Sequence, residues 1–203
     1  MSASDDLVAS GIVLAGGRSS RFGSDKLTAR LGSGTLLDRA IAALAMVASD
    51  VVIVVAPGDE RVPAATPGPL RIVEDPERHG GPLVGLLAGL ESVGEPIVLV
   101  VGGDMPSLRP DVLRLLARTL LADSAFDAVA VRFRGAVVPL PIALRTGAAT
   151  DAARRLTGDG ERRLRSVLER LPTRILEEGE WRPLDPDGET LRDVDRVEDL
   201  PTS

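Results

Sequence analysis

The chain's single lysine lies in the segment whose residue types are best suited to chemistry. Against 23 arginines there is one lysine, Lys26, and it ends residues 14–26, Leu-Ala-Gly-Gly-Arg-Ser-Ser-Arg-Phe-Gly-Ser-Asp-Lys. A flexible ammonium suits the oxygens of a triphosphate, whereas the planar guanidinium of arginine suits flat partners that accept two hydrogen bonds. The use of lysine at this one position therefore predicts a contact between Lys26 and a triphosphate.

A strand and a turn of small residues come before this lysine. Residues 7–14 are mostly apolar, as expected for a strand buried on both faces, and Ala15, Gly16 and Gly17 follow. Small residues let backbone N–H groups approach a ligand closely, and ligands of open α/β sheets bind at the carboxyl ends of strands. The segment has neither the Gly-Lys-Ser/Thr of a Walker loop nor a Gly-x-Gly-x-x-Gly pattern, so we predict a phosphate-binding loop of another kind.

An acidic residue follows a second apolar strand. Residues 96–101 form that predicted strand, and Asp104 comes directly after it in Val-Gly-Gly-Asp-Met-Pro, residues 101–106. Magnesium in proteins is held by one or two carboxylates together with phosphate oxygens and water. Asp104 is therefore a candidate metal ligand, although a carboxylate that caps a turn or helix would have the same local pattern.

Two further segments could approach a nucleotide. Asp75 ends the predicted strand 70–73, where an aspartate that starts a turn before proline is an equally good local explanation. Gly80 and Gly81 precede a predicted helix, and a glycine-rich helix N-terminus accepts anions, although a plain helix start would look the same. His79, the single histidine, is given no role because a lone loop histidine is more often solvated.

The loop at residues 14–26 resembles the nucleotide-binding signature of the nucleotidyltransferases related to molybdenum cofactor guanylyltransferase. The matching pattern is Leu-Ala-Gly-Gly-x-Ser-x-Arg-Phe-Gly-x-Asp-Lys. The resemblance covers almost the whole chain and weakens towards the C-terminus. It implies that the glycines and basic residues Gly16, Gly17, Arg21 and Lys26 hold the triphosphate, and that Leu14 and Ala15 also belong to the nucleotide-binding site.

Other segments resemble later motifs of the same family. By that resemblance Asp104 binds the metal, Asp75 contacts the base or ribose, and Gly80 and Gly81 approach the nucleotide. Residues 158–165 resemble a Gly-Glu-Arg-Arg segment, which implies that Arg162 and Arg163 hold a second phosphorylated substrate, the pterin monophosphate; a solvated helix face is the alternative.

The closing motif departs from the family pattern. Asp193 and Asp195 stand where the guanylyltransferases usually have asparagines, and Val138 precedes Pro139 where many relatives have histidine. Either residue type could reach a magnesium ion, so Asp195 is a second candidate metal ligand. The departure leaves the choice between a guanine and a cytosine nucleotide open.

Composition excludes several other classes of protein. The 203 residues carry a net charge of −6, which disfavours a nucleic-acid binder. Aromatic residues make up 2% of the chain, which disfavours base stacking as the basis of recognition, and the lack of cysteine excludes a thiolate metal site. No signal peptide or membrane span is recognisable. We expect one domain over residues 1–203, ordered from about residue 7, and a cytoplasmic location.

Strand-like and helix-like patterns alternate along the chain. This alternation predicts an α/β fold, with a Rossmann-like, mainly parallel sheet and helices on both faces. The resemblance implies the same fold, that of the nucleotide-diphospho-sugar transferases. Besides residues 7–14, the predicted strands are 51–55, 70–73, 96–101, 127–131, 136–144 and 174–176, and the predicted helices are 36–47, 82–93, 110–121, 148–157 and 161–170.

The resemblance implies a magnesium-dependent nucleotidyltransferase. It would transfer GMP from GTP to the phosphate of molybdopterin and release pyrophosphate, with a molybdoenzyme or an insertion factor as a plausible protein partner. Two other enzymes remain open: a cytidylyltransferase acting on the same cofactor, and a nucleotidyltransferase for sugar or alcohol phosphates. A nucleotide-binding accessory protein without catalysis is the alternative of a different class.

Overall fold

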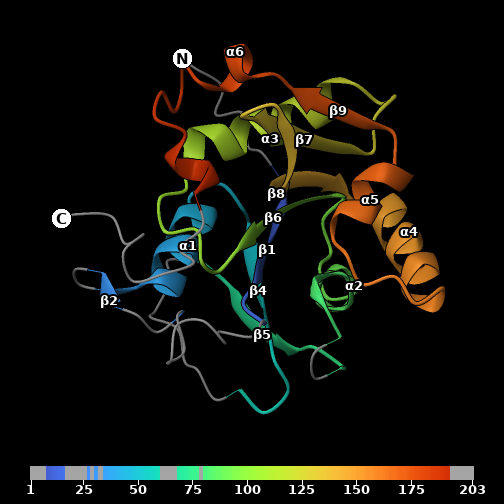
Figure 1. Cartoon of the computed structure of the whole chain (residues 1–203). Coiled ribbons are helices and arrows are strands. Elements are labelled where there is room, and N and C mark those ends of the chain that lie inside the picture. The colour runs from blue at the N-terminus through green and yellow to red at the C-terminus, as the bar shows by residue number, and fades with distance from the viewer. Residues whose placement is uncertain are drawn as a thin grey trace.

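A computed structural model describes residues 8–16, 27, 30–31, 34–59, 68–77 and 80–192 of the chain. Within these residues a seven-stranded sheet has the order β5-β4-β1-β6-β8-β7-β9 (Figure 1). Its strands are β1 (Ser10–Leu14), β4 (Asp50–Val55), β5 (Leu70–Glu74), β6 (Ile97–Gly102), β7 (Ala128–Phe133), β8 (Ala136–Arg145) and β9 (Thr173–Leu176). A separate antiparallel pair joins β2 (Arg30–Leu31) to β3 (Gly34–Thr35).

The sheet is mainly parallel, as predicted. β5, β4, β1 and β6 run in parallel, and β9 pairs in parallel with β7. β8 is antiparallel to both of its neighbours. The short connection between β7 and β8 requires this, because parallel strands need a crossover of a dozen residues or more. Arg134 and Gly135 make the turn with positive φ of 49° and 80°, the backbone of a tight hairpin.

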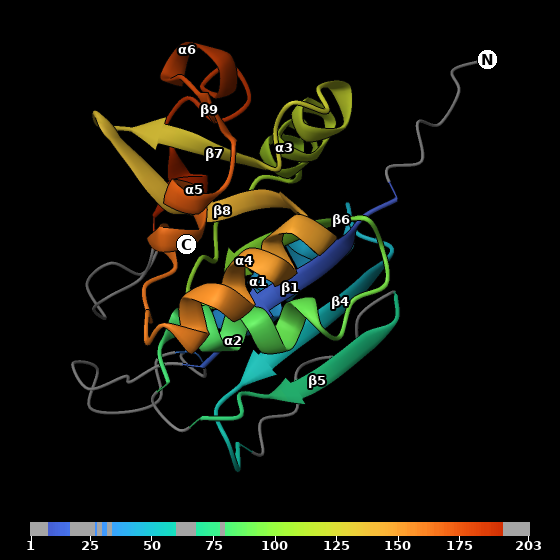
Figure 2. The same ribbon diagram turned by 90° about the vertical axis from the view of Figure 1, so that its right-hand side faces the viewer.

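Helices cover both faces of the sheet, which confirms the predicted layers. α1 (Leu36–Ala45) and α3 (Pro110–Ala122) pack on one face, and α2 (Pro82–Leu90), α4 (Thr146–Gly158) and α5 (Arg165–Arg170) pack on the other (Figures 1 and 2). Neighbouring strand residues alternate between the two cores, because successive side chains point to opposite faces. In the described part no helix is long and apolar enough to cross a membrane.

The predicted helix over 161–170 was wrong in its first half, because α5 begins at Arg165. Gly160 has a positive φ of 84°, and the Glu161 carboxylate accepts hydrogen bonds from the backbone N–H groups of Arg162 and Arg163. Glu161 thus closes a turn with its side chain before α5 begins.

The chain reverses direction across the sheet at β1. It runs from β1 to β4 and then to β5 on one side, and returns to place β6 on the other side of β1. In open α/β sheets ligands bind at such a switch point, beyond the carboxyl ends of the strands. Leu14 and Gly102, the last residues of β1 and β6, are direct partners there.

Candidate functional site

The end of β1 is bonded to the strands on both sides. The Gly103 N–H donates to the Leu14 carbonyl at 3.0 Å, and the Ala15 N–H donates to the Val54 carbonyl at 2.8 Å. A side chain on Gly103 would have its Cβ 3.4 Å from the Leu14 carbonyl oxygen. Glycine therefore allows the turn after β6 to lie directly against the start of the loop that follows β1.

Asp104 lies at this junction, half-buried beyond the end of β6. The turn before it is closed by hydrogen bonds from the Met105 N–H to the Gly102 carbonyl and from the Gly102 N–H to the Met105 sulfur. A Cβ on Gly102 would come within 2.6 Å of Asp104 Oδ1. The carboxylate therefore leans back over Gly102, the last residue of β6.

Asp75 follows β5 and is almost fully buried. Its N–H donates to the Val55 carbonyl, and its Oδ1 accepts a hydrogen bond from the Glu77 N–H at 2.9 Å. Asp75 Oδ2 and the Leu14 side chain both lie within 4 Å of the Cβ that Gly85 lacks. Because Gly85 on α2 has no side chain, Leu14 at the carboxyl end of β1 and the Asp75 carboxyl can both lie against this helix.

Burial raises the pKa of the Asp75 carboxyl above its ordinary value of 3.8, although the hydrogen bond from the Glu77 N–H lowers it. The folded chain therefore binds the proton more tightly than the unfolded chain. Since the unfolded state loses its proton first, stability falls as the pH rises from 3.8 through the pKa of the folded state.

We therefore expect Asp75→Asn to be more stable than the wild type at neutral pH, because the amide keeps an acceptor for Glu77 N–H without a buried charge. Urea denaturation between about pH 3 and pH 7 measures this, and the difference should vanish at the acid end. A variant that is less stable than the wild type at neutral pH would show that the carboxylate itself stabilises the fold.

The N-terminus of α2 is docked against the segment that precedes α5. Gly81 has a positive φ of 90°, and a Cβ there would lie 2.9 Å from the Cβ and 3.0 Å from the carbonyl oxygen of Arg162. The Leu83 N–H, in the first turn of α2, donates to that same carbonyl at 3.2 Å. No side chain caps this helix, so the Arg162 backbone takes part of that role.

Arg162 and Arg163 are predicted to bind the same substrate, but their side chains make different contacts. The Arg162 guanidinium donates to the Thr157 and Glu161 carbonyls and lies 3.5 Å from the Glu77 carboxylate, next to Gly80 and Gly81. The Arg163 side chain is 75% exposed and is paired with Glu161 at 2.8 Å. The hydrogen bonds from Arg163 hold the pKa of the Glu161 carboxyl well below its usual range. Arg162 therefore joins the candidate site, whereas the Arg163 side chain is engaged by Glu161.

Gly81→Ala should separate these two segments. The positive φ alone costs a residue with a side chain about 1–3 kcal/mol, and the contact with Arg162 adds to it. Gly94→Ala is the matched control, because Gly94 has open space around its Cβ position and no positive φ. Chemical denaturation should give a loss of about 1–3 kcal/mol for the first variant and a near-neutral effect for the second. Equal stability of the two variants would contradict this docking.

Four predicted site residues lie outside the described residues: Gly17, Arg21, Lys26 and Asp195, together with Asp193. The others, apart from Arg163, form an arc along the carboxyl edge of the sheet, from Asp104 through Leu14, Ala15 and Gly16 to Asp75, Gly80, Gly81 and Arg162. Glu77 and Glu161 also belong to this arc. Sequence reasoning missed both, because a carboxylate that positions an arginine has no spacing signal of its own.

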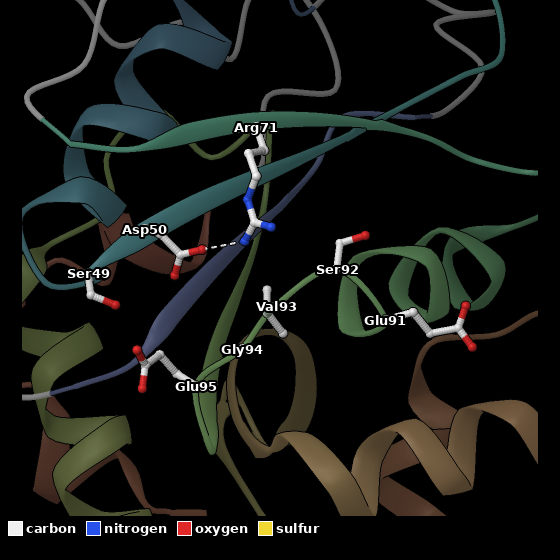
Figure 3. A pocket seen from close by; sticks show the side chains of 8 residues that line it. All are labelled: Ser49, Asp50, Arg71, Glu91, Ser92, Val93, Gly94 and Glu95. Atoms are coloured by element: carbon white, nitrogen blue, oxygen red, sulfur yellow. Dashed lines mark hydrogen bonds and ion pairs between the residues drawn. The ribbon is translucent and has the colours of Figure 1, made fainter.

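A shallow cavity of about 450 Å³ opens at the opposite end of the sheet (Figure 3). Asp50 begins β4 and Arg71 lies near the start of β5, and the two are paired across the cavity at 2.7 Å. This cavity therefore lies away from the candidate site at the carboxyl ends of the strands. Its lining residues are Ser49, Asp50, Arg71, Glu91, Ser92, Val93, Gly94 and Glu95.

Comparison with solved structures supports the fold. Molybdopterin-guanine dinucleotide biosynthesis protein A from Archaeoglobus fulgidus superposes with a TM-score of 0.76 at 23% identity, covering 94% of each chain. The 2-C-methyl-D-erythritol 4-phosphate cytidylyltransferase from Thermus thermophilus does so with a TM-score of 0.67 at 19% identity, covering 95% of each chain. Both identities are low, so these structures show the fold and not the substrate.

Sequence comparison shows the family. A probable molybdenum cofactor guanylyltransferase from Chloroflexus aggregans is 33% identical over 197 residues, which is 96% of this chain and 92% of the relative. A protein with the same description from Mycolicibacterium paratuberculosis is 32% identical over 170 residues, 81% of this chain and 83% of the relative. Residues 11–175 match the family model of the MobA-like NTP transferase domain, and the chain belongs to that family.

Proposed function

We propose that this chain is a molybdenum cofactor guanylyltransferase, which transfers GMP from GTP to the terminal phosphate of molybdopterin and releases pyrophosphate. The observation that carries the proposal is the meeting of Leu14 and the Asp104 turn at the switch point of the sheet. The relative from Chloroflexus aggregans, similar over 96% of this chain, supports the choice of GTP and molybdopterin. Since the seven strands of the main sheet come from residues 10 to 176, we also propose that residues 1–203 act as a single domain.

The residues of the arc suit an in-line transfer. The attacking phosphate oxygen is already an anion near neutral pH, so the site needs no strong general base. Catalysis then depends on holding the two substrates in line and on neutralising the charge that develops on the triphosphate. Backbone N–H groups after β1, with Arg21 and Lys26, would hold the triphosphate, and Asp75 would contact the base or ribose.

Asp104 would hold magnesium in this site. Among the described residues no group of three or more acidic or histidine side chains could hold a metal ion by itself. One carboxylate fits magnesium nevertheless, because this ion takes few protein ligands and completes its shell with phosphate oxygens and water. Bound magnesium would neutralise charge on the reacting phosphates. Asp195 is the proposed second ligand.

Arg162 and Arg163 would bind the phosphate of the acceptor. Guanidinium groups bind phosphate oxygens with two parallel hydrogen bonds. Arg162 lies beside Gly81 and Glu77, at the opposite end of the arc from Asp104. A second substrate bound there could meet the nucleotide. Arg163 is the more exposed of the two and would have to leave Glu161 to take part.

A cytidylyltransferase acting on the same cofactor is the second candidate. Asp193 and Asp195 favour it, because the guanylyltransferases that this chain resembles usually have asparagines there. A nucleotidyltransferase for an alcohol or sugar phosphate has the same fold, as the Thermus thermophilus enzyme illustrates. An accessory protein that binds a nucleotide without catalysis would bind GTP but release no pyrophosphate.

Thermal melting with GTP, CTP, ATP and UTP, each with and without magnesium, tests the proposal. A ligand at about 100 times its Kd adds roughly 2.7 kcal/mol of stability, which a melting curve resolves. We expect GTP with magnesium to give the largest shift. A larger shift with CTP would overturn the choice of base and support the cytidylyltransferase.

The setting of the reaction follows from its substrates. GTP is a nucleotide of the cytoplasm, which supports a cytoplasmic location for this enzyme. A molybdoenzyme or an insertion factor would receive the product, so either is a candidate partner. A pull-down with immobilised protein and purified molybdoenzyme apoprotein would test this partnership.

A further inference from the structure

One carboxylate holds the turn between α4 and α5. Glu161 Oε1 accepts hydrogen bonds from the backbone N–H groups of Arg162 at 2.8 Å and of Arg163 at 3.0 Å. Its Oε2 accepts a hydrogen bond from the hydroxyl of Ser166, a buried residue, at 2.7 Å. The Glu161 side chain is 22% exposed, so water is partly excluded from these bonds. The carboxylate therefore fixes the backbone that carries the Arg162 side chain.

The Arg162 guanidinium is held firmly on one side only. Its Nη1 donates to two carbonyl oxygens, that of Thr157 at 3.1 Å and that of Glu161 at 3.0 Å. Its Nη2 lies 3.5 Å from Glu77 Oε2, whereas a charge-assisted hydrogen bond between such groups is about 2.7–2.9 Å long. Both side chains of this long contact are solvent-exposed, so it contributes little. A phosphate with better geometry can therefore replace the Glu77 carboxylate at Nη2.

A single peptide group links the Glu161 carboxylate to the Arg162 guanidinium. The peptide bond between these two residues directs its N–H to the carboxylate and its C=O to Nη1. Because a peptide group is planar, the orientation of its N–H determines the direction of its C=O. The carboxylate thus sets the position of the carbonyl that orients the guanidinium.

We propose that Glu161 is a positioning residue for the phosphorylated acceptor of nucleotidyl transfer. It fixes the peptide group between residues 161 and 162, and through it the Arg162 guanidinium, so that Nη2 meets a phosphate of the acceptor in place of Glu77. This inference rests on the proposed function. It adds to that function a residue that touches neither substrate and acts through Arg162.

The test compares Glu161→Ala with Glu161→Gln. Alanine removes both oxygens, whereas glutamine keeps one oxygen that can accept the two backbone N–H groups. We expect alanine to raise KM for molybdopterin about tenfold, with KM for GTP nearly unchanged, because a misdirected guanidinium loses a charge-assisted hydrogen bond to the acceptor. Glutamine should restore most of the affinity for molybdopterin. Transfer of label from the α-phosphate of GTP gives both constants, at a temperature where melting curves show each variant folded.

A second comparison tests whether the effect passes through Arg162. Arg162→Ala keeps the backbone of the turn and lacks the guanidinium. If Glu161 acts through that guanidinium, adding Glu161→Ala to this variant should raise KM for molybdopterin no further. A further rise as large as in the wild-type background would mean that alanine only loosens the turn, and it would overturn the positioning role.

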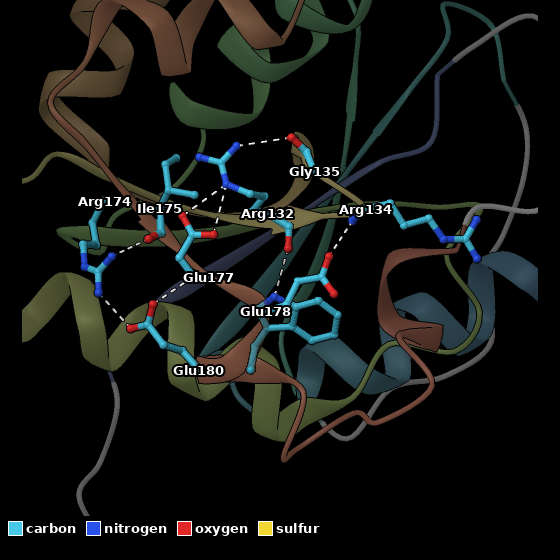
Figure 4. Close-up of polar contacts among 9 residues, drawn as sticks. Arg132, Arg134, Gly135, Arg174, Ile175, Glu177, Glu178 and Glu180 are labelled. Carbon is cyan, nitrogen blue, oxygen red and sulfur yellow. Dashed lines mark hydrogen bonds and ion pairs between the residues drawn. The ribbon is translucent and has the colours of Figure 1, made fainter.

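Glu178→Ala is the matched control. Glu178 lies in the helix α6 (Glu178–Trp181), accepts a hydrogen bond from the Arg134 N–H at 2.6 Å and pairs with Arg182 at 2.7 Å. Figure 4 shows its contact with Arg134, where the β7–β8 hairpin meets α6. Like Glu161, it combines a backbone donor with an arginine partner, but neither partner belongs to the candidate site. The control should lower the melting temperature and keep both KM values.

Three results would overturn the inference and leave the proposed function standing. These are a wild-type KM for molybdopterin in Glu161→Ala, an equal rise of the two KM values in that variant, and a rise of KM for molybdopterin in Glu178→Ala as large as in Glu161→Ala. A wild type that transfers no label to molybdopterin from any nucleotide would overturn the proposed function, and this inference with it.

Discussion

Replacing Asp104 by asparagine is expected to lower the rate of pyrophosphate release from GTP by about a hundredfold or more, with little change in melting temperature. Asparagine has the shape of aspartate, so it fits the restricted space beside Gly102, where an added Cβ would lie 2.6 Å from Asp104 Oδ1. What it lacks is the negative charge that holds a hard divalent cation. The loss should therefore appear in catalysis and not in folding.

Three observations make this variant informative. Asp104 is half-buried, so the substitution removes no core packing. The backbone of its turn is held by Gly102, Gly103 and Met105, none of which changes. Asp111→Asn is the control, because Asp111 is an exposed carboxylate in the first turn of α3 that pairs with Arg114. Normal turnover by Asp104→Asn would remove the metal assignment, as would an equal loss in the control.

Replacing Lys26 by arginine should have the second largest effect, although the charge is kept. A guanidinium is larger than an ammonium, and its donors lie in one plane. This geometry suits a flat carboxylate, whereas the compact ammonium of lysine suits phosphate oxygens that surround it. We expect kcat/KM for GTP to fall about tenfold to a hundredfold, because misplaced charge stabilises the transition state poorly.

The chain provides a control for this exchange in the opposite direction. Arg155→Lys, on the exposed side of α4, should leave the kinetics unchanged, which excludes a general effect of exchanging the two cations. Unchanged kinetics in Lys26→Arg would mean that the single lysine of this chain is a coincidence of composition.

The fold could be predicted from the sequence because its signals are local. Residues 51–55 and 96–101 are continuous apolar runs, and such runs flanked by helical patterns predict parallel strands buried on both faces. The antiparallel β8 could also have been predicted, because the connection from β7 is too short for a crossover. The wrong start of α5 has a different origin. Gly160 has a positive φ, and the Glu161 side chain closes a local turn by accepting hydrogen bonds from the Arg162 and Arg163 N–H groups. Helical periodicity does not reveal such a turn before the helix.

The candidate site was predictable only in part. Asp104 could be predicted because it follows a strand end, and Gly81 because it precedes a helix start. Glycines in the sequence mark both places. The meeting of Arg162 with Glu77, 85 positions apart in the chain, is tertiary and has no local signal. Contacts of this kind depend on how the helices and loops pack on the sheet, and the periodicity of apolar residues does not determine that packing.

Transfer of label from GTP to molybdopterin tests the central claim most directly. The purified chain would be incubated with molybdopterin, magnesium and GTP labelled at the α-phosphate, and the products separated. We expect the label to appear in a molybdopterin–guanine dinucleotide, with one pyrophosphate released for each dinucleotide formed, and Asp104→Asn to form both about a hundredfold more slowly, or slower still. Label transferred from CTP and not from GTP would contradict the guanylyltransferase, and GTP binding without any transfer would contradict an enzyme.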